Sequence, residues 1–167
     1  PDDDLGADLY ELTQEVLDSA GMPAYEVSNH ARAGAESRHN LIYWRSGDWV
    51  GVGPGAHGRI TTKDGVHKAT RNYKMPDRYM DAVDQNGVGW FDAPETTPRL
   101  RAEERLMMGL RLTQGVETSG LDTDYFNAKG MGLMKKMGFL EETAGYLRLT
   151  PQGRPLLDGV LAQLLDG

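Results

Sequence analysis

The fold is predicted from YEVSNHARAGAESRHNLIYWRSGDWVGVGPGAHG, residues 25–58. Apolar and polar side chains alternate over residues 24–28, which is typical of a strand, and a second short apolar run occupies residues 49–53. Before the first strand, apolar residues recur at helical spacing from Leu5 to Leu17. Because a helix followed by a strand is one repeat of an α/β fold, we expect α/β architecture.

A glycine-rich turn follows the second apolar run. Its candidate binding residues are Gly51, Gly53, Gly55, Ala56 and His57. Glycine lets a ligand approach the backbone where a side chain would collide. The turn lacks the Lys-Ser/Thr of a P-loop, and no clear helix begins after it, so a phosphate-cradling loop is disfavoured. Two interpretations remain: a ligand-approach loop, or a tight end to a strand.

Aromatic, basic and imidazole side chains are concentrated at residues 38–45. If this segment is a short helix, His39 and Tyr43 stand four residues apart on one face. An imidazole beside aromatic rings and guanidinium groups could ligate the metal of a flat macrocycle, stack on its ring and pair with its carboxylates. The candidate residues are Arg38, His39, Asn40, Tyr43, Trp44 and Arg45. A structural histidine packed among aromatic rings is the alternative.

Composition excludes several classes of site. The 167 residues carry 18 Lys and Arg against 25 Asp and Glu, a net charge of −7, which disfavours a nucleic-acid partner for the whole chain. The absence of Cys excludes disulfides, thiolate nucleophiles and Cys-ligated iron–sulfur clusters in this polypeptide. No apolar run is long enough for a membrane span, although a peripheral membrane contact stays open.

The middle of the chain predicts a hairpin and then a helix. Residues 60–70 are expected to pair across a turn at Asp64-Gly65. Residues 75–86 predict a helix that ends at Gly87. The Gly-, Pro- and Thr-containing residues 87–98 are expected to be a connection, and a candidate domain boundary.

The last 70 residues predict a small helical module. The expected elements are helices at 99–112 and 125–137, a hairpin at 139–149, and a last helix that Thr150 caps, with Pro151 at its first position. This order resembles a winged helix. Residues 96–167 have equal numbers of acidic and basic residues, which makes DNA binding unfavourable. A non-catalytic winged-helix interaction module is therefore kept as one alternative function.

Residues 25–58 resemble the C-terminal part of the radical SAM haem chaperone family (HemW-like), which is related to oxygen-independent coproporphyrinogen III oxidase. The resemblance lies in the YEVSN segment at 25–29, the His-Asn-x-x-Tyr-Trp motif at 39–44 and the Gly-x-Gly-x-Gly-Ala-His loop at 51–57. EERLMMGLRLTQGV, residues 103–116, is similar to the start of the family's C-terminal domain.

The resemblance implies a fold and a domain order. Residues 1–62 would be the last helix and strands of a radical SAM partial TIM barrel, 63–95 a hairpin and linking helix, and 96–167 a small, mostly helical, winged-helix-like domain. The family's [4Fe–4S] cluster ligands are cysteines near the N-terminus of the full protein, and this chain has none. We therefore expect that the chain cannot be catalytic alone.

The resemblance also implies a function and site residues. The full protein would be a cytoplasmic chaperone that binds haem and transfers it to haem-dependent proteins. His39 would contact haem or ligate its iron, Tyr43 and Trp44 would pack on the ring, and Arg38 or Arg45 would pair with propionates. The glycine loop would lie on the S-adenosyl-L-methionine side.

Partners and an alternative follow from the same resemblance. The expected partners are haem, haem-accepting proteins and the N-terminal half of the same protein, and the fragment is expected to self-associate through unpaired strand edges. The alternative function is oxygen-independent oxidative decarboxylation of coproporphyrinogen propionates.

Overall fold

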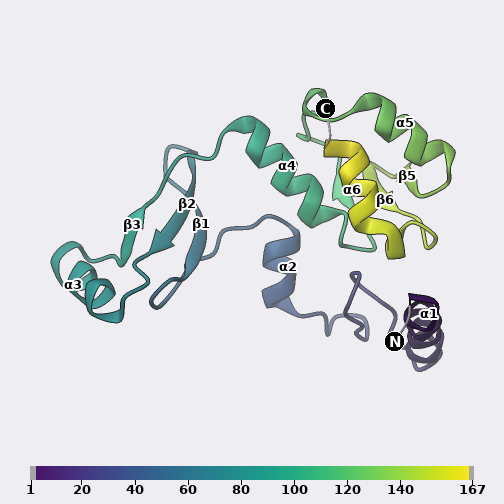
Figure 1. The fold of residues 1–167 in the computed structure, drawn as a ribbon, viewed down its shortest axis with the longest axis horizontal. Coiled ribbons are helices and arrows are strands. Elements are labelled where there is room, and N and C mark those ends of the chain that lie inside the picture. The colour runs from purple at the N-terminus through teal and green to yellow at the C-terminus, as the bar shows by residue number, and fades with distance from the viewer. Residues whose placement is uncertain (1–2, 166–167) are drawn as a thin grey trace. The chain divides into compact units, whose positions relative to one another are not determined.

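The computed structural model describes residues 3–165, which fall into two compact units. The first unit combines the chain up to Arg45 with the chain from Ala102 onward, and the second is Ser46–Arg101. Each unit contains one three-stranded antiparallel sheet (Figure 1). The α/β content expected from the sequence is therefore confirmed, while the partial barrel and the domain boundaries at residues 62 and 95 stay predictions.

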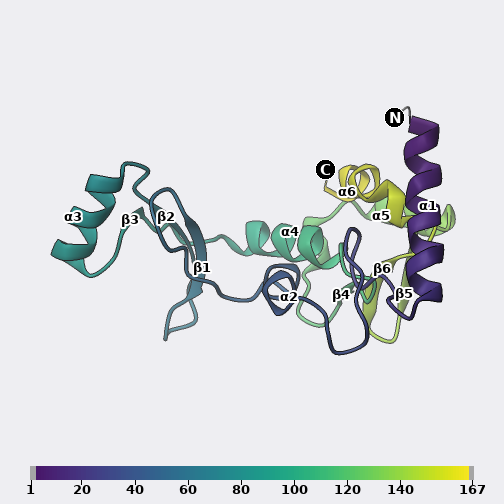
Figure 2. The same ribbon diagram turned by 90° about the horizontal axis from the view of Figure 1, so that it is seen from below.

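The first helix, α1 (Asp3–Ser19), confirms the predicted apolar periodicity, and Gly21 follows it with a φ of 71°. Figure 2 shows α1 side-on. Its apolar stripe is not covered by other described residues. The side chains on this stripe are each about half exposed, at 48–56%: Leu5, Leu9, Leu12 and Val16. The inward face is formed instead by the half-buried Tyr10, Gln14 and Leu17.

The strand predicted at residues 24–28 is wrong. The chain reverses at once, because the amide of Tyr25 donates to the carbonyl of Asn29 and Ala24 bridges His30. The segment instead contacts the chain near residue 112 through one isolated bridge, Glu26 to Leu112. A strand needs a partner that runs alongside it for several residues, and this short reversal does not provide one.

The C-terminal part of the first unit forms around the second sheet. Its elements are α4 (Pro98–Gly109, whose first turn lies in the second unit), β4 (Val116–Glu117), the 3₁₀ turn η1 (Thr123–Tyr125), α5 (Ala128–Lys136), β5 (Leu140–Thr143), β6 (Tyr146–Leu149), the 3₁₀ turn η2 (Arg154–Leu156) and α6 (Leu157–Leu165). The sheet order is β4-β6-β5, and the predicted hairpin is confirmed. Its core includes the fully buried Leu106, Leu110, Leu140 and Leu164.

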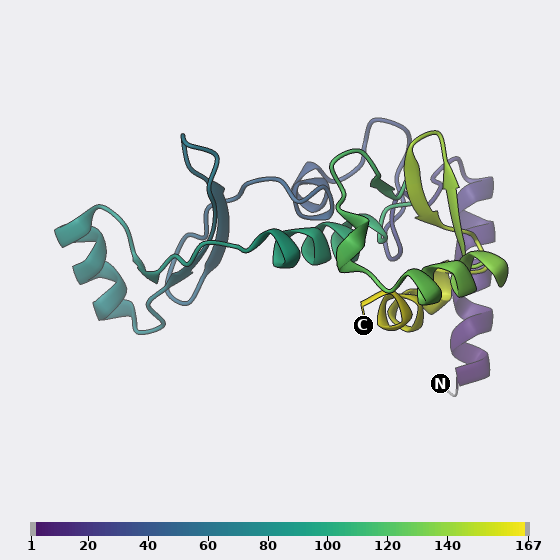
Figure 3. The ribbon, with the colours of Figure 1, turned by 90° about the horizontal axis from the view of Figure 1, so that it is seen from above.

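Helices α5 and α6 pack closely together beside this hairpin (Figure 3). Gly130 makes the approach possible, because a Cβ there would come within 1.9 Å of the Gln163 carbonyl oxygen. The sequence suggests that this glycine weakens the helix, and the structure shows what it allows. The Asn127 side chain caps α5 by accepting from the amides of Lys129 and Gly130.

The predicted start of the last helix is wrong. The helix α6 begins at Leu157, after η2, and not at Thr150. The Thr150 hydroxyl does accept a hydrogen bond, from the Gly153 amide, but it caps a turn rather than a helix. Pro155 accounts for part of the difference, since it lacks an amide hydrogen and cannot donate the helical bond to the carbonyl four residues earlier.

The second unit contains β1 (His57–Thr61), β2 (His67–Asn72), α3 (Pro76–Asn86) and β3 (Trp90–Asp92), with sheet order β1-β2-β3. The hairpin β1–β2 and the helix α3 confirm their predictions, with Gly65 and Gly87 at φ of 83° and 75°. The expected connection at 87–98 is partly wrong, because β3 forms within it and pairs with β2. Figure 2 shows α3 beside β3.

The strand predicted at residues 49–53 is also wrong. Trp49 alone bridges Arg59, and the chain then turns away through Gly53, whose φ is 99°, and Pro54. Neither residue suits the interior of a strand. Across residues 3–165, every helix is too short or too polar to span a membrane.

Candidate functional site

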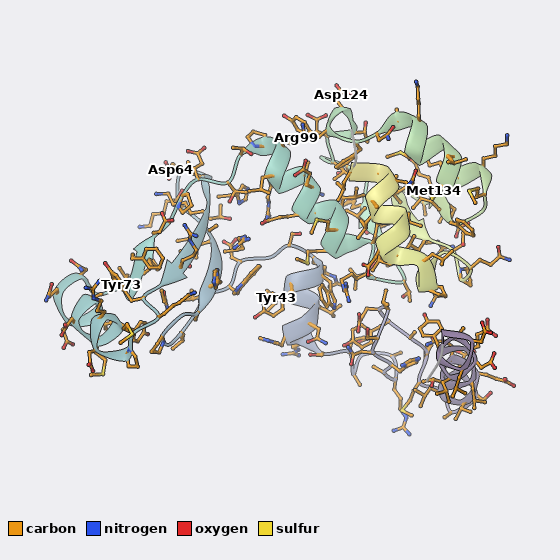
Figure 4. All side chains as sticks on the ribbon, viewed as in Figure 1. Tyr43, Asp64, Tyr73, Arg99, Asp124 and Met134 are labelled. Carbon is orange, nitrogen blue, oxygen red and sulfur yellow. The ribbon has the colours of Figure 1, made fainter. Side chains whose placement is uncertain are left out.

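The predicted short helix at residues 38–45 is confirmed as α2 (Arg38–Trp44). Ser37 caps it by accepting a hydrogen bond from the Asn40 amide. His39 is exposed, and its ring meets the Tyr43 ring edge-on, with centroids 4.8 Å apart and an interplanar angle of 84°. Figure 4 labels Tyr43 on this helix. The imidazole is therefore accessible and oriented by one aromatic neighbour, not enclosed in the core.

Asn40 and Trp44, the other two residues of the motif, contact side chains elsewhere in the first unit. The Asn40 side-chain amide donates to the Tyr25 hydroxyl at 3.3 Å. The half-buried Trp44 ring lies under the Arg111 guanidinium, 4.7 Å from its centroid. Helix α2 therefore offers His39 to solvent, while Asn40 and Trp44 attach it to residues 25 and 111.

Arg38 and Arg45 are both exposed at the ends of this helix region. The structure thus brings His39 and Tyr43 into contact. Trp44 instead packs on Arg111. Arg111 was not singled out by sequence reasoning. Its position within EERLMMGLRLTQGV, which was quoted only as part of the resemblance, was the signal available.

The glycine loop of the second unit is explained largely by its own packing. A Cβ at Gly51 would lie 2.3 Å from the His57 carbonyl oxygen. Gly53 and Gly55 have φ of 99° and 73°, a conformation that strains other residues. These three glycines are thus required to form the turn, which favours the tight-turn interpretation without testing the ligand-approach one.

Asn72 holds this loop in place. Its buried side-chain amide donates to the carbonyl oxygens of Gly51 and Gly53, at 3.0 and 2.9 Å. The Gly53 amide donates to the Tyr79 hydroxyl at 3.2 Å, and the Gly55 amide donates to the Tyr73 carbonyl at 2.8 Å. Much of the loop's backbone hydrogen-bonding capacity is therefore engaged. Sequence reasoning missed Asn72, because an amide at the end of a strand gives no pattern.

His39 and the glycine loop belong to different units. Ala56 is half-buried and His57 is exposed at the start of β1.

Metal and cluster sites can be assessed from the side chains present. The sequence contains no Cys, so a Cys-ligated cluster does not fit this chain. Among residues 3–165, no group of three His, Cys, Asp or Glu side chains could hold a metal ion. A single exposed imidazole could supply one ligand to an iron whose other ligands come with a macrocycle, and a structural histidine remains the alternative.

The acid of the YEVSN segment is unusually buried. Glu26 is 1% exposed, and one carboxylate oxygen accepts from the Asn29 side chain. Its other oxygen is buried with no hydrogen-bond partner among the described residues. Sequence reasoning treated Glu26 only as a strand residue.

Comparison with known proteins agrees with the resemblance stated from the sequence. The family model described as HemN C-terminal domain matches residues 96–156. The heme chaperone HemW of Bacillus subtilis is 32% identical, over 99% of this chain and 44% of its own length. The mitochondrial radical S-adenosyl methionine domain-containing protein 1 of Dictyostelium discoideum is 34% identical, over 99% of this chain and 43% of its own length.

The predicted resemblance to the radical SAM haem chaperone family is confirmed. It concerns the C-terminal part of these proteins, and the chain spans about two fifths of the length of the curated relatives it matches. The structure matches that reported as "Coproporphyrinogen III oxidase (HemN) from Escherichia coli is a Radical SAM enzyme", with a TM-score of 0.69 at 16% identity. That match covers 98% of this chain and 41% of the oxidase chain, and it shows a shared fold.

Proposed function

We propose that this chain is the haem-side part of a chaperone that binds haem and transfers it to haem-dependent proteins. The observation that supports this most is the exposed His39 imidazole, held edge-on to Tyr43 in the His-Asn-x-x-Tyr-Trp motif. Relatives that match the chain over nearly its whole length are named heme chaperone HemW. His39 would bond axially to the haem iron, because a neutral imidazole is a common haem ligand.

The neighbours of His39 would orient the macrocycle. Tyr43 is half-buried beside the imidazole, so its ring would pack against the macrocycle face or edge. Arg38 and Arg45 are exposed and free to approach propionates, for which a guanidinium is a suitable partner. We assign Trp44 to holding the helix on Arg111, and no longer to stacking on haem.

The S-adenosyl-L-methionine and [4Fe–4S] groups would belong to the complete protein. The cluster supplies an electron for radical chemistry when bound, and this chain has no ligand for it. The glycine loop would offer S-adenosyl-L-methionine a flat backbone surface for van der Waals contact. The Gly51 and Gly53 carbonyl oxygens and the Gly53 amide are less suited to hydrogen-bond it, because Asn72 already donates to the two oxygens and Tyr79 already accepts from the amide.

Haem titration of the complete protein tests this function. We expect His39→Ala to weaken haem binding and to shift its absorption spectrum. The matched control is His67→Ala, which removes an imidazole that contacts the Thr61 hydroxyl at 2.9 Å within the hairpin. Unchanged haem affinity and spectrum in His39→Ala would contradict the assignment.

Oxygen-independent decarboxylation of coproporphyrinogen is the second candidate, and the structural match to the oxidase is the observation that favours it. An activity assay with reconstituted cluster separates the two, because a chaperone should not turn over that substrate. We propose the cytoplasm as the compartment for a bacterial protein of this kind. The Dictyostelium and mouse relatives are named mitochondrial, so the compartment differs among relatives.

A further inference from the structure

An open cavity of about 1040 Å³ lies within the first unit, and His39 is not among its lining residues. Its lining comes from α1, from residues 154–159 of η2 and α6, and from Val27, Ser28, His30 and Arg111. Figures 2 and 3 show α1 alongside these C-terminal elements. The volume is at the upper end of what small-molecule sites occupy, roughly 300–1,000 Å³.

Two arginines line this cavity, Arg111 and Arg154. In each of them the Nε atom is buried and has no hydrogen-bond partner among the described residues. A buried donor without a partner is unfavourable, and a bound ligand that reorients the guanidinium is one way to relieve this cost. The cavity lining includes one carboxylate, Asp158, so basic groups are in excess there.

Arg111 is held in position by the motif at residues 39–44. Its guanidinium packs on the Trp44 ring, and its carbonyl accepts from the Val27 amide at 2.9 Å. Both Val27 and Arg111 line the cavity. The Trp44 end of the motif therefore reaches this cavity through Arg111.

The rest of the lining is mostly apolar, and no group of three His, Cys, Asp or Glu side chains that could hold a metal ion occurs among the described residues. Leu9, Val27, Pro155 and Leu157 supply apolar walls. His30 lines the cavity too, but its Nε2 lies 3.2 Å from the Gln14 side-chain oxygen. Two arginines beside apolar walls suit a ligand that carries carboxylates on a large apolar body.

We propose that Arg111 and Arg154 bind the carboxylates of a tetrapyrrole in this cavity. The choice of a tetrapyrrole rests on the proposed function, since haem is an apolar macrocycle with two propionates. The cavity would be a second position for it, separate from the one at His39 where Arg38 and Arg45 would meet the propionates. Each guanidinium offers a charge-assisted, bidentate contact to one carboxylate. Trp44 acts as a positioning residue that sets the orientation of Arg111.

Metal-free protoporphyrin IX is the probe, because its binding does not depend on an axial imidazole. In the complete protein, fluorescence titration should show about tenfold or greater weakening for Arg154→Leu and for Arg111→Leu, as expected for loss of a charge-assisted pair. The matched control is Arg32→Leu, which removes an exposed arginine that does not line the cavity. Protoporphyrin IX dimethyl ester, which lacks the charges, should bind the wild-type protein and the variants alike.

Folding and function are separated by further variants. Arg154→Lys keeps the charge and should recover part of the affinity. Arg154 takes no part in the contact between Arg111 and Trp44, so its variants test the proposal even if Arg111→Leu fails to fold. Trp44→Phe should weaken porphyrin binding less than Arg111→Leu, because a ring remains under the guanidinium.

Each outcome decides between the two proposals. Unchanged porphyrin affinity in a folded Arg154→Leu protein overturns the cavity proposal, and if His39→Ala still weakens haem binding, the proposed function stands. Weakened porphyrin binding in the arginine variants, with no effect of His39→Ala on haem, supports the cavity and removes the axial ligand. If the wild-type protein binds neither compound, both proposals fall.

Discussion

The Arg111 guanidinium lies 4.7 Å from the centroid of the Trp44 ring. This contact joins the helix of the His-Asn-x-x-Tyr-Trp motif to the segment that follows α4, 67 residues further along the chain (111 − 44). It gives the last residue of the motif a structural task and leaves the first, His39, exposed.

Replacing Trp44 tests this contact. We expect Trp44→Ala to lower the free energy of unfolding by about 2–4 kcal/mol, because a half-buried ring and its cation–π contact are both lost. Trp44→Phe should cost less, about 1 kcal/mol, since it keeps a smaller ring. Urea unfolding of the two variants measures the difference, and equal losses would show that the ring under Arg111 does not matter.

Replacing Asn72 tests how the glycine loop is held. Asn72→Ala leaves the Gly51 and Gly53 carbonyl oxygens without their shared donor, and we expect a loss of about 2–4 kcal/mol. Asn72→Asp should be at least as harmful, because a carboxylate faces two carbonyl oxygens. The exposed Asn86 at the end of α3 provides the control, Asn86→Ala, which should leave the unfolding midpoint nearly unchanged. Similar midpoints for the Asn72 and Asn86 variants would refute the role of Asn72.

Two glycine substitutions should have opposite effects. Gly51→Ala places a Cβ 2.3 Å from a backbone oxygen, so we expect a loss of several kcal/mol, on the order of 3. Gly132→Ala lies in α5 with nothing within 4 Å of the new Cβ, and it should stabilise the protein by about 0.5–1 kcal/mol. Thermal unfolding of both variants gives the signs. Destabilisation by Gly132→Ala would show that its surroundings are tighter than the structure indicates.

The Asp64 carboxyl group, at the β1–β2 turn, should titrate below the usual range of a carboxyl group. Hydrogen bonding from the Thr62 side chain and then from its own backbone lowers the pKa of Asp64, which Figure 4 places at the β1–β2 turn, below its ordinary value of 3.8. A lowered folded pKa stabilises the protein above pH 3.8, and this stabilisation is lost as the pH falls through the folded pKa. NMR titration of Asp64 should therefore give a midpoint under 3.8, and a midpoint at or above it would be contrary to this account.

The exposed stripe of α1 should make this chain associate. Leu5, Leu9, Leu12 and Val16 present contiguous apolar surface, which in solution favours contact with another copy or with the rest of a longer protein. Size-exclusion chromatography of the 167-residue chain at two concentrations should show larger species at the higher one. The variant Leu12→Lys with Val16→Lys should reduce them. A clean monomer at both concentrations would remove the idea.

Periodic features of the sequence predicted the elements that local chemistry decides. Helices α1 and α3 and the hairpins around Gly65 and Gly145 follow from apolar spacing and from glycines with positive φ. The strands predicted at residues 24–28 and 49–53 were wrong for a common reason. Alternation of side chains does not reveal whether a partner strand is available, and at these places the chain turns away instead.

The sequence predicted which residues form the candidate site better than it predicted what each of them does. A four-residue spacing was enough to predict the contact between His39 and Tyr43. Two contacts join residues far apart in the sequence, and no local pattern encodes them. They are the contact of Trp44 with Arg111 and the hydrogen bonds from Asn72 to the glycine loop. The buried Nε atoms of Arg111 and Arg154 emerge only when the whole unit is assembled.

The haem spectrum of the complete protein tests the central claim most directly. If the exposed imidazole of His39 binds the iron, His39→Ala should change the Soret band, and added free imidazole should restore the wild-type band. An identical Soret band in wild-type and His39→Ala proteins, unaffected by imidazole, would contradict the account.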